Sequence, residues 1–168
     1  MKKLKFNLLT GLLLLISVSV FAAGFPPPDK VQETFQKMYP KVTTVDWQRK
    51  GDYHIADIRV DGRELNVWFS DKGKWLMTEV DVETLEAVPA AVAKAFMQST
   101  MASMQLEDVR IITFPKQPAV IVIEVEEYNT DSEFQLFYAP DGKLLQTLNV
   151  SDTGGAVSYT HLRAHETG

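Results

Sequence analysis

The residue types that carry out most enzymatic chemistry are sparse in this sequence. It has no cysteine to act as a thiol nucleophile, no Gly-x-Ser-x-Gly nucleophile elbow and no phosphate-binding glycine loop. Ahead of residue 156 the only histidine is His54, so that part of the chain has no zinc-type histidine pair. Carboxylates are abundant, but sequence spacing does not give the distance between two of them. We therefore expect a protein that is not an enzyme and that uses no cofactor and no metal.

Two features have the residue types of a chemical site, and we interpret both as structural. The acidic residues near the middle of the second half could supply the oxygens that calcium prefers. They lack the interleaved Asp and Gly spacing of a calcium loop, which favours a solvated strand end and turn; they are Glu124, Glu126, Glu127, Asp131 and Glu133. His54 has the same strand parity as Phe69, which indicates a partly buried structural histidine rather than a base.

The pair Asp61-Gly62 predicts a two-residue β-turn, because Asp-Gly supplies the positive φ angles that such a turn needs. Pairing through this turn sets Val60 opposite Arg63 and, further along, Ile55 opposite Trp68. Side-chain alternation then separates two faces. The apolar face, expected to receive helices, has Ala56, Ile58, Leu65, Val67 and Phe69. The other face has Tyr53, Ile55, Asp57, Arg59, Glu64, Asn66 and Trp68.

This second, mixed face has the composition of a protein interface. One hypothesis is that Trp68 and Arg59 anchor a protein partner. The alternative is a solvated face, on which Arg59 and Glu64 form a cross-strand pair contributing a few tenths of a kcal/mol and Trp68 shields Ile55. Trp75 completes the candidate binding set, although a bulge in the turn before it would reset the alternation and leaves its face open.

Two segments with helical periodicity must position this face. Asp29 is expected to cap the first helix, and Pro89 is a favoured first-turn residue for the second. The apolar stripes are Val31, Phe35 and Met38 in the first segment, and Val92, Phe96 and Ser99 or Thr100 in the second.

Eight further segments have strand character. They are residues 42–47, 53–60, 63–69, 75–82, 109–114, 119–126, 133–138 and 144–150. Since Asp141-Gly142-Lys143-Leu144 echoes Lys72-Gly73-Lys74-Trp75, we predict a tandem repeat of one helix and four antiparallel strands, with halves at about 28–82 and 89–150. The predicted fold class is α+β, with a sheet of about eight strands and two helices on one face. The opposite face is then solvated or used by a partner.

The N-terminal end has the order of a secretory signal peptide. Lys2, Lys3 and Lys5 precede an apolar run, residues 8–21, that closes on Ala22. The run is shorter than the roughly 20 residues of a bilayer span, which favours cleavage over a membrane anchor. We expect residues 1–22 to be removed near Ala22, or next at Ala23, and residues 23–150 to form one domain located in the periplasm or secreted, without membrane insertion.

The C-terminal residues 151–168 are expected to be a disordered tail. From residue 156 they resemble a translated sequencing-adapter scar, and we exclude them as non-native. Removing Lys2, Lys3, Lys5, Arg163 and Glu166 from the 17 basic and 22 acidic residues leaves a net charge of about −8. No basic stripe remains, which argues against nucleic acid and anionic membranes as partners and favours a partner with a basic rim.

The first half resembles a known family. The residues that carry this resemblance are Trp47, Tyr53, Ala56, Gly62, Glu64, Val67, Phe69, Gly73-Lys74-Trp75-Leu76, Thr78-Glu79, Pro89 and Val92. In this order they are similar to the PepSY-like, beta-lactamase-inhibitor-like proteins of the Bacteroidetes cell envelope. The resemblance covers Pro28 to about Val150 and is weaker in the second half, where Leu144 replaces the tryptophan. It implies secretion, a tandem helix-plus-four-strand unit, no known catalytic residues, and an analogy with inhibitors that grip a hydrolase on the open sheet face.

Two functional hypotheses follow from the residues and the resemblance together. The first is a non-catalytic periplasmic module whose open face binds an envelope protein or peptide and inhibits a peptidase or other hydrolase. The second is a small-ligand-binding or envelope-stress-linked module, which would need a closed pocket of some hundreds of Å³ rather than a broad face. The oligomeric state and the partner's identity are not given by the sequence.

Overall fold

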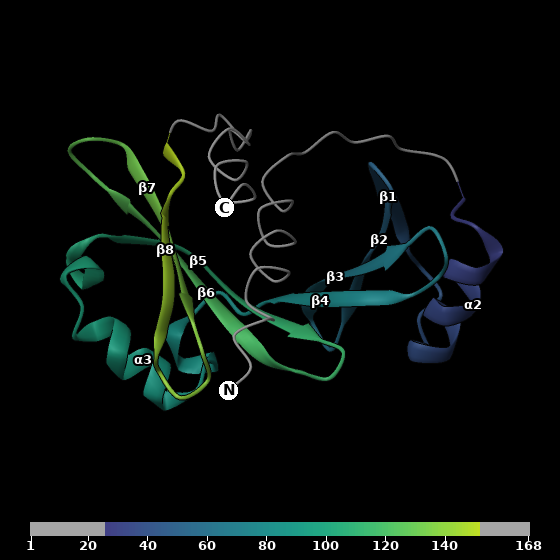
Figure 1. Cartoon of the computed structure of the whole chain (residues 1–168), viewed down its shortest axis with the longest axis horizontal. Coiled ribbons are helices and arrows are strands. Elements are labelled where there is room, and N and C mark those ends of the chain that lie inside the picture. Colours follow the sequence, from purple (N-terminus) through teal and green to yellow (C-terminus); the bar gives the residue numbers. More distant parts are fainter. Residues whose placement is uncertain (1–25, 152–168) are drawn as a thin grey trace, which may run out of the picture.

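The structure, a computed structural model, describes residues 26–151, which form one open antiparallel sheet with a helix against each half (Figure 1). Each strand pairs with the next along the chain, in the order β1 to β8. The strands are β1 (Asp46–Lys50), β2 (Tyr53–Val60), β3 (Arg63–Ser70), β4 (Trp75–Asp81), β5 (Gln105–Phe114), β6 (Gln117–Glu127), β7 (Ser132–Tyr138) and β8 (Leu144–Asn149). The predicted α+β class with an eight-stranded sheet is confirmed. The predicted signal peptide and tail lie outside the described residues.

Two α-helices, α2 (Asp29–Met38) and α3 (Ala90–Met97), and two short 3-10 turns, η2 (Leu85–Ala87) and η3 (Thr100–Ser103), complete the fold. A proline directly precedes each α-helix and accepts its first backbone hydrogen bonds, from Val31 to the Pro28 carbonyl at 2.8 Å and from Val92 to the Pro89 carbonyl at 2.9 Å. The expectation that Asp29 caps the first helix is wrong, because Asp29 is its first residue. Its carboxylate instead stands in the first turn, where the helix dipole favours negative charge.

Both helices pack on the same face of the sheet, as predicted. The cluster under α2 contains Val31, Phe35, Ala56, Ile58, Val67 and Phe69. The cluster under α3 contains Val92 and Phe96 together with Val109, Ile121, Ile123, Val125, Leu136 and Tyr138. The strand register joins the two clusters on one side, since Leu65 pairs with Val80 and Val80 with Ile111. Burying a side chain such as Phe35 contributes roughly 1.5–3 kcal/mol.

The β2–β3 hairpin has the register predicted from its turn, from Val60 opposite Arg63 to Ile55 opposite Trp68. The predicted bounds of two other strands are wrong. β1 begins at Asp46 rather than at Val42, because Val42 and Val45 pack against the α2 cluster from the connection that follows α2. β5 begins at Gln105, four residues before the predicted start, and its exposed first residues extend the pairing with β6.

The two halves share their local geometry at corresponding points. The strand register shifts between Trp68 and Phe69 in the first half and between Phe137 and Tyr138 in the second. After each shift comes a glycine with positive φ, at +76° in Gly73 and +87° in Gly142. These shared irregularities agree with a helix-plus-four-strand unit that is used twice.

Each of these glycines lies directly against the start of a helix. A Cβ atom on Gly73 would stand 2.5 Å from the carbonyl oxygen of Lys30, the second residue of α2. On Gly142 it would stand 2.5 Å from the carbonyl oxygen of Ala91, the second residue of α3. A hydrogen in place of a side chain therefore allows each helix to lie against its half of the sheet.

We predict that Gly73→Ala and Gly142→Ala each destabilise the fold by about 3 kcal/mol, because positive φ strains alanine and the new methyl group meets a helix carbonyl. Gly62→Ala is the matched control. Gly62 has φ of +82°, but a methyl group added to it would have no other atom within 4 Å, so only the backbone strain of about 1–2 kcal/mol is expected. Urea unfolding measures all three, and equal losses would contradict the helix contact.

Candidate functional site: the helix-free sheet face

Seven of the eight predicted binding residues lie on the sheet face that neither α2 nor α3 covers. The observed register puts them all on that side; they are Tyr53, Ile55, Asp57 and Arg59 on β2, and Glu64, Asn66 and Trp68 on β3. Trp75 does not join them. The register shift after Trp68 pairs Trp75 with Phe69, and its indole packs in the α2 cluster. Its Nε1 donates to Thr78 Oγ1 at 3.0 Å, so Trp75 cannot share one surface with the other seven.

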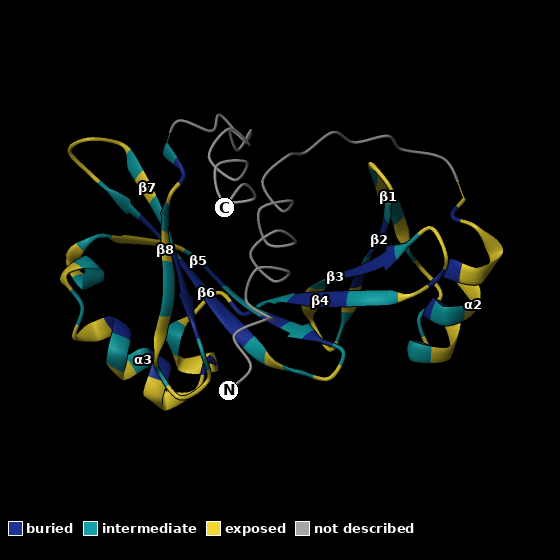
Figure 2. Cartoon of the chain, viewed as in Figure 1, coloured by how far each residue is buried: buried dark blue, intermediate teal, exposed yellow. Residues whose placement is uncertain are grey.

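The helix-free face has an apolar cluster of its own, which we call the apolar band. It consists of Ile55, Trp68, Met77, Ile112, Phe114, Val120, Val122 and Phe137, on β2 to β7. Figure 2 shows the result in β6, where Val120 to Ile123 are buried in an unbroken run because both faces are apolar there. Sequence reasoning missed the part of the band in the second half. That unbroken run was the available signal, since a one-sided strand alternates.

Trp68 lies deep within this band. Trp68 is 3% exposed. The centroid of the Tyr53 ring lies 6.2 Å from the centroid of the Trp68 ring, and the Lys50 ammonium lies 5.6 Å from the indole centroid. Ile55 is its cross-strand partner. A partner that approaches this face would therefore meet Tyr53 and Lys50 before it reached the indole.

A buried carboxyl group, Glu79 on β4, adjoins Trp68. The Glu79 residue is 4% exposed, and this burial raises its pKa to about 7. Arg110, the indole N–H of Trp68 and Lys50 act in the opposite direction and lower the pKa. The indole approaches the carboxyl group without reaching hydrogen-bond geometry. Within residues 26–151, Glu79 Oε1 and Trp68 Nε1 thus have no hydrogen-bond partner.

Arg110 on β5 is engaged with other carboxylates. Its Nη2 donates to Glu124 Oε2 at 2.8 Å, and Gln135 Nε2 donates to the same oxygen at 2.9 Å. Arg110 Nε lies 2.5 Å from Asp108 Oδ2, an ion pair whose angle is too poor for a hydrogen bond. Burial is the largest cause that raises the pKa of Asp108, and the guanidinium of Arg110 opposes it.

The helix-free face is acidic. Among the strand residues that the register puts on this side, the acids are Asp46, Asp57, Glu64, Glu79, Asp81, Asp108, Glu124, Glu126 and Glu133, and the bases are Lys50, Arg59 and Arg110. Arg59 and Glu64 form the cross-strand ion pair that the sequence suggested, with both side chains more than half exposed. Solvent screens such a pair, so its contribution to stability is a few tenths of a kcal/mol.

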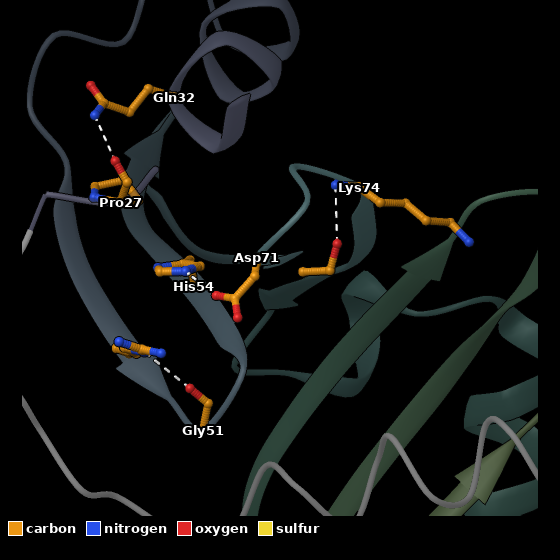
Figure 3. Close-up of polar contacts among 8 residues, drawn as sticks. Pro27, Gln32, Gly51, His54, Asp71 and Lys74 are labelled. Carbon is orange, nitrogen blue, oxygen red and sulfur yellow. Dashed lines mark hydrogen bonds and ion pairs between the residues drawn. The ribbon is translucent and has the colours of Figure 1, made fainter. Parts of the chain in front are cut away.

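The remaining polar candidates have structural positions. His54 is buried on the helix side, as predicted, and its Nε2 lies 2.7 Å from Asp71 Oδ1, which ties β2 to the turn after β3 (Figure 3). At the β6–β7 turn, Glu127 accepts a hydrogen bond from Thr130. In the part of the chain that the structure describes, no three acidic or histidine side chains are arranged to hold a metal ion.

Two open hollows flank the β2–β3 hairpin. The larger, of about 390 Å³, is lined by Lys41, Val42, Thr43, Thr44, Asp46, Asp57, Ile58, Arg59 and Glu64. The smaller, of about 220 Å³, is lined by Arg59, Gly62, Arg63, Glu64, Asp81, Val82 and Glu83. Both open widely to solvent, unlike the enclosed pocket that holds most small ligands. Between residues 26 and 151, no helix is long and apolar enough to cross a membrane.

Fold and face together define an α+β open-sheet module with helices on one side and a mixed apolar and acidic surface on the other. Residues 56–146 match the model of the family described as "putative beta-lactamase-inhibitor-like, PepSY-like". The chain belongs to this family, as its resemblance to it predicted. Family membership suggests a non-catalytic, inhibitor-like module.

Solved structures from Bacteroides share the fold. A DUF2874 family protein from Bacteroides ovatus is 40% identical with a TM-score of 0.76, covering 84% of this chain and 100% of its own. A BLIP-like protein from Bacteroides fragilis is 35% identical with a TM-score of 0.70, covering 77% and 90%. A protein from Bacteroides eggerthii described as a putative periplasmic protein is 32% identical with a TM-score of 0.73, covering 76% and 91%. No curated protein matches the chain.

We predict that Glu79→Gln changes how stability depends on pH. Because the folded state holds the Glu79 proton more tightly than the unfolded chain, the free energy of unfolding falls as pH rises from about 4.5 to about 7, by at most about 3 kcal/mol. Glutamine resembles the protonated acid. The variant should be about 1–3 kcal/mol more stable than the wild type at pH 8 and within about 1 kcal/mol of it at pH 5.

Urea unfolding at both pH values measures this difference. The control is Glu64→Gln, whose side chain is 60% exposed and should alter stability little at either pH. If Glu79→Gln followed the wild type at both pH values, the raised pKa would be wrong.

Proposed function

We propose that this protein is a non-catalytic periplasmic module that binds a protein or peptide on its helix-free face and acts as an inhibitor of its partner. The observation that carries the proposal is the apolar band, which runs over β2 to β7 on a face that neither α-helix covers. The eight residues of the band are each at most 7% exposed, so a partner would first contact the half-buried and charged residues around them, such as Tyr53. An apolar centre surrounded by polar residues is typical of protein interfaces.

The relatives support the cellular location and the inhibitor-like role. The Bacteroides eggerthii protein is described as putatively periplasmic, and the Bacteroides fragilis protein as BLIP-like. The order of basic, apolar and small residues in 1–22 has the form of a secretory signal. The proposal extends both descriptions to this chain.

The shape of the face favours a macromolecule over a small ligand. The band spreads across six strands, whereas the two hollows beside the β2–β3 hairpin are small and open to solvent. A small ligand that contacted so broad a face would leave most of its own surface in water. A protein or an extended peptide can cover the band and meet the acidic rim at the same time.

We predict that a photo-crosslinking residue in place of Tyr53 captures a specific partner in the periplasm of a Bacteroides host, whereas the same residue in place of Met97 does not. Tyr53 is a half-buried residue of the helix-free face, and Met97 on α3 is 62% exposed on the helix side. The two sites report on opposite faces of one folded protein.

The captured partner must then bind the purified protein directly. Tyr53→Ala should weaken this binding roughly tenfold or more, as expected for an aromatic residue near an interface centre. Leu144→Ala, at an exposed position of the edge strand β8, should leave the affinity within about twofold. If the partner is a hydrolase, its activity should fall as the complex forms. Equal capture of the partner at Tyr53 and Met97 would contradict the proposal. An unchanged affinity of the partner for Tyr53→Ala would contradict it as well.

A further inference from the structure

Among the described residues, three buried polar atoms without hydrogen bonds lie on neighbouring strands of the helix-free face, and one of them, Arg110 Nε, is in an ion pair with Asp108. Glu79 on β4 pairs with Asn66 on β3 and with Ile112 on β5. Trp68 and Arg110 are therefore its diagonal neighbours on that face. Within residues 26–151, Glu79 Oε1, Trp68 Nε1 and Arg110 Nε all lack a hydrogen bond. Native proteins rarely leave such atoms unsatisfied, so a cluster of them indicates a missing partner.

The unsatisfied atom that most needs a partner is the carboxylate oxygen. Arg110 is already committed, because its guanidinium contacts Asp108 and Glu124. An indole N–H is a single neutral donor, which costs less to leave alone than a charged group. Glu79 can accept hydrogen bonds through its free Oε1, and a donor that also carries positive charge would suit it best.

Within residues 26–151, Arg110 and Lys50 are the cations whose charges act on Glu79, and Lys50 is the weaker of the two. It ends the edge strand β1, just before the turn at Gly51, and its ammonium lies over the Trp68 ring while its charge is felt at Glu79. Burial lowers the pKa of Lys50, so its charged form is held at a cost. No hydrogen bond joins Lys50 to Glu79 Oε1, and a long flexible side chain on an edge strand can swing out into solvent.

The net negative charge of the helix-free face favours a positively charged partner group. Nine acids and three bases lie on this side of the sheet, and two of those bases, Arg59 and Arg110, are paired with acids of the same face. A partner surface that carries lysine or arginine is complementary to this field, and an acidic one is repelled.

We infer that Glu79 is the anchor for a lysine or arginine side chain of the bound partner, which enters between Trp68 and Arg110 and displaces the Lys50 side chain. This inference rests on the proposed function and specifies its chemistry. The aliphatic part of the incoming side chain would lie against the apolar band, and its charged end would donate to Glu79 Oε1. Glu79 must be ionised for this contact, so a proton that it holds in the free protein is released to solvent.

The same arrangement makes binding depend on pH. The charged and polar groups that act on Glu79 are Lys50 from β1, Trp68 from β3, and Arg110 and Asp108 from β5. With its pKa near 7, Glu79 is largely protonated at pH 6 and largely ionised at pH 8. The affinity for a cationic side chain should rise about tenfold over this interval.

The test uses a phage-displayed library of random dodecapeptides, selected on the purified wild-type protein and on Glu79→Gln. We expect the wild type to enrich lysine or arginine at one position beside apolar residues, and Glu79→Gln to lose that enrichment. Replacing the selected basic residue with glutamine in a synthetic peptide should weaken binding to the wild type about tenfold and binding to Glu79→Gln less than twofold. The wild type alone should show the rise in affinity between pH 6 and pH 8.

The Lys50→Met variant should have the opposite effect to Glu79→Gln on the binding of basic peptides. It removes the internal cation and keeps most of the aliphatic stem, so basic peptides should bind it more tightly than they bind the wild type. Circular dichroism confirms that each variant is folded. Peptides that bind the wild type and Glu79→Gln equally, with loss on Tyr53→Ala, would overturn this inference and leave the proposed face intact. Selected peptides whose binding is indifferent to both Glu79→Gln and Tyr53→Ala would overturn the proposed function as well.

Discussion

The contact on which the arrangement depends is the one between a turn glycine and the start of a helix, made once in each half. Gly73 meets the Lys30 carbonyl and Gly142 meets the Ala91 carbonyl, at distances that no side chain would allow. Both glycines follow a register shift in the sheet, and both helices lie on the same face. The apolar stripes of α2 and α3 are buried on that face, and neither helix covers the opposite face of the sheet.

That other face contains one group that is costly to bury. Eight apolar residues pack against one another there without a helix, and a carboxyl group is buried beside them with its pKa raised to about 7. Replacing Glu79 with an apolar residue of similar size would remove an unsatisfied acceptor from the band. A sequence shaped only by folding would be expected to make that exchange. An acid at this point is consistent with a donor that lies outside the chain.

Sequence reasoning succeeded where a short-range rule decided the geometry. The Asp61-Gly62 turn fixed the register of β2 and β3, and with it the face of every residue in that hairpin. It failed where long-range packing decided. Val42 and Val45 have strand character, yet they pack against the α2 cluster from a connection. The sequence left the face of Trp75 open because of a possible bulge, and the register shift between Trp68 and Phe69 places it on the helix side. Glu79 stood in the motif that carried the family resemblance, but its burial depends on neighbours from other strands.

The two halves of the sheet differ in how polar groups on the helix-free face are satisfied. Glu124 and Gln135 pair at positions that correspond to Asp57 and Asn66, two residues before the register shift in each half. In the second half the carboxylate of this pair has hydrogen-bond donors, since Gln135 and Arg110 both donate to Glu124. In the first half burial raises the pKa of Asp57, with Glu64 and Asp46 adding to the effect. Within residues 26–151, Glu79 Oε1 on β4 has no hydrogen bond whereas the Glu124–Gln135 pair is satisfied, so we expect a partner's cationic groups to meet β2 to β4 rather than β6 to β8.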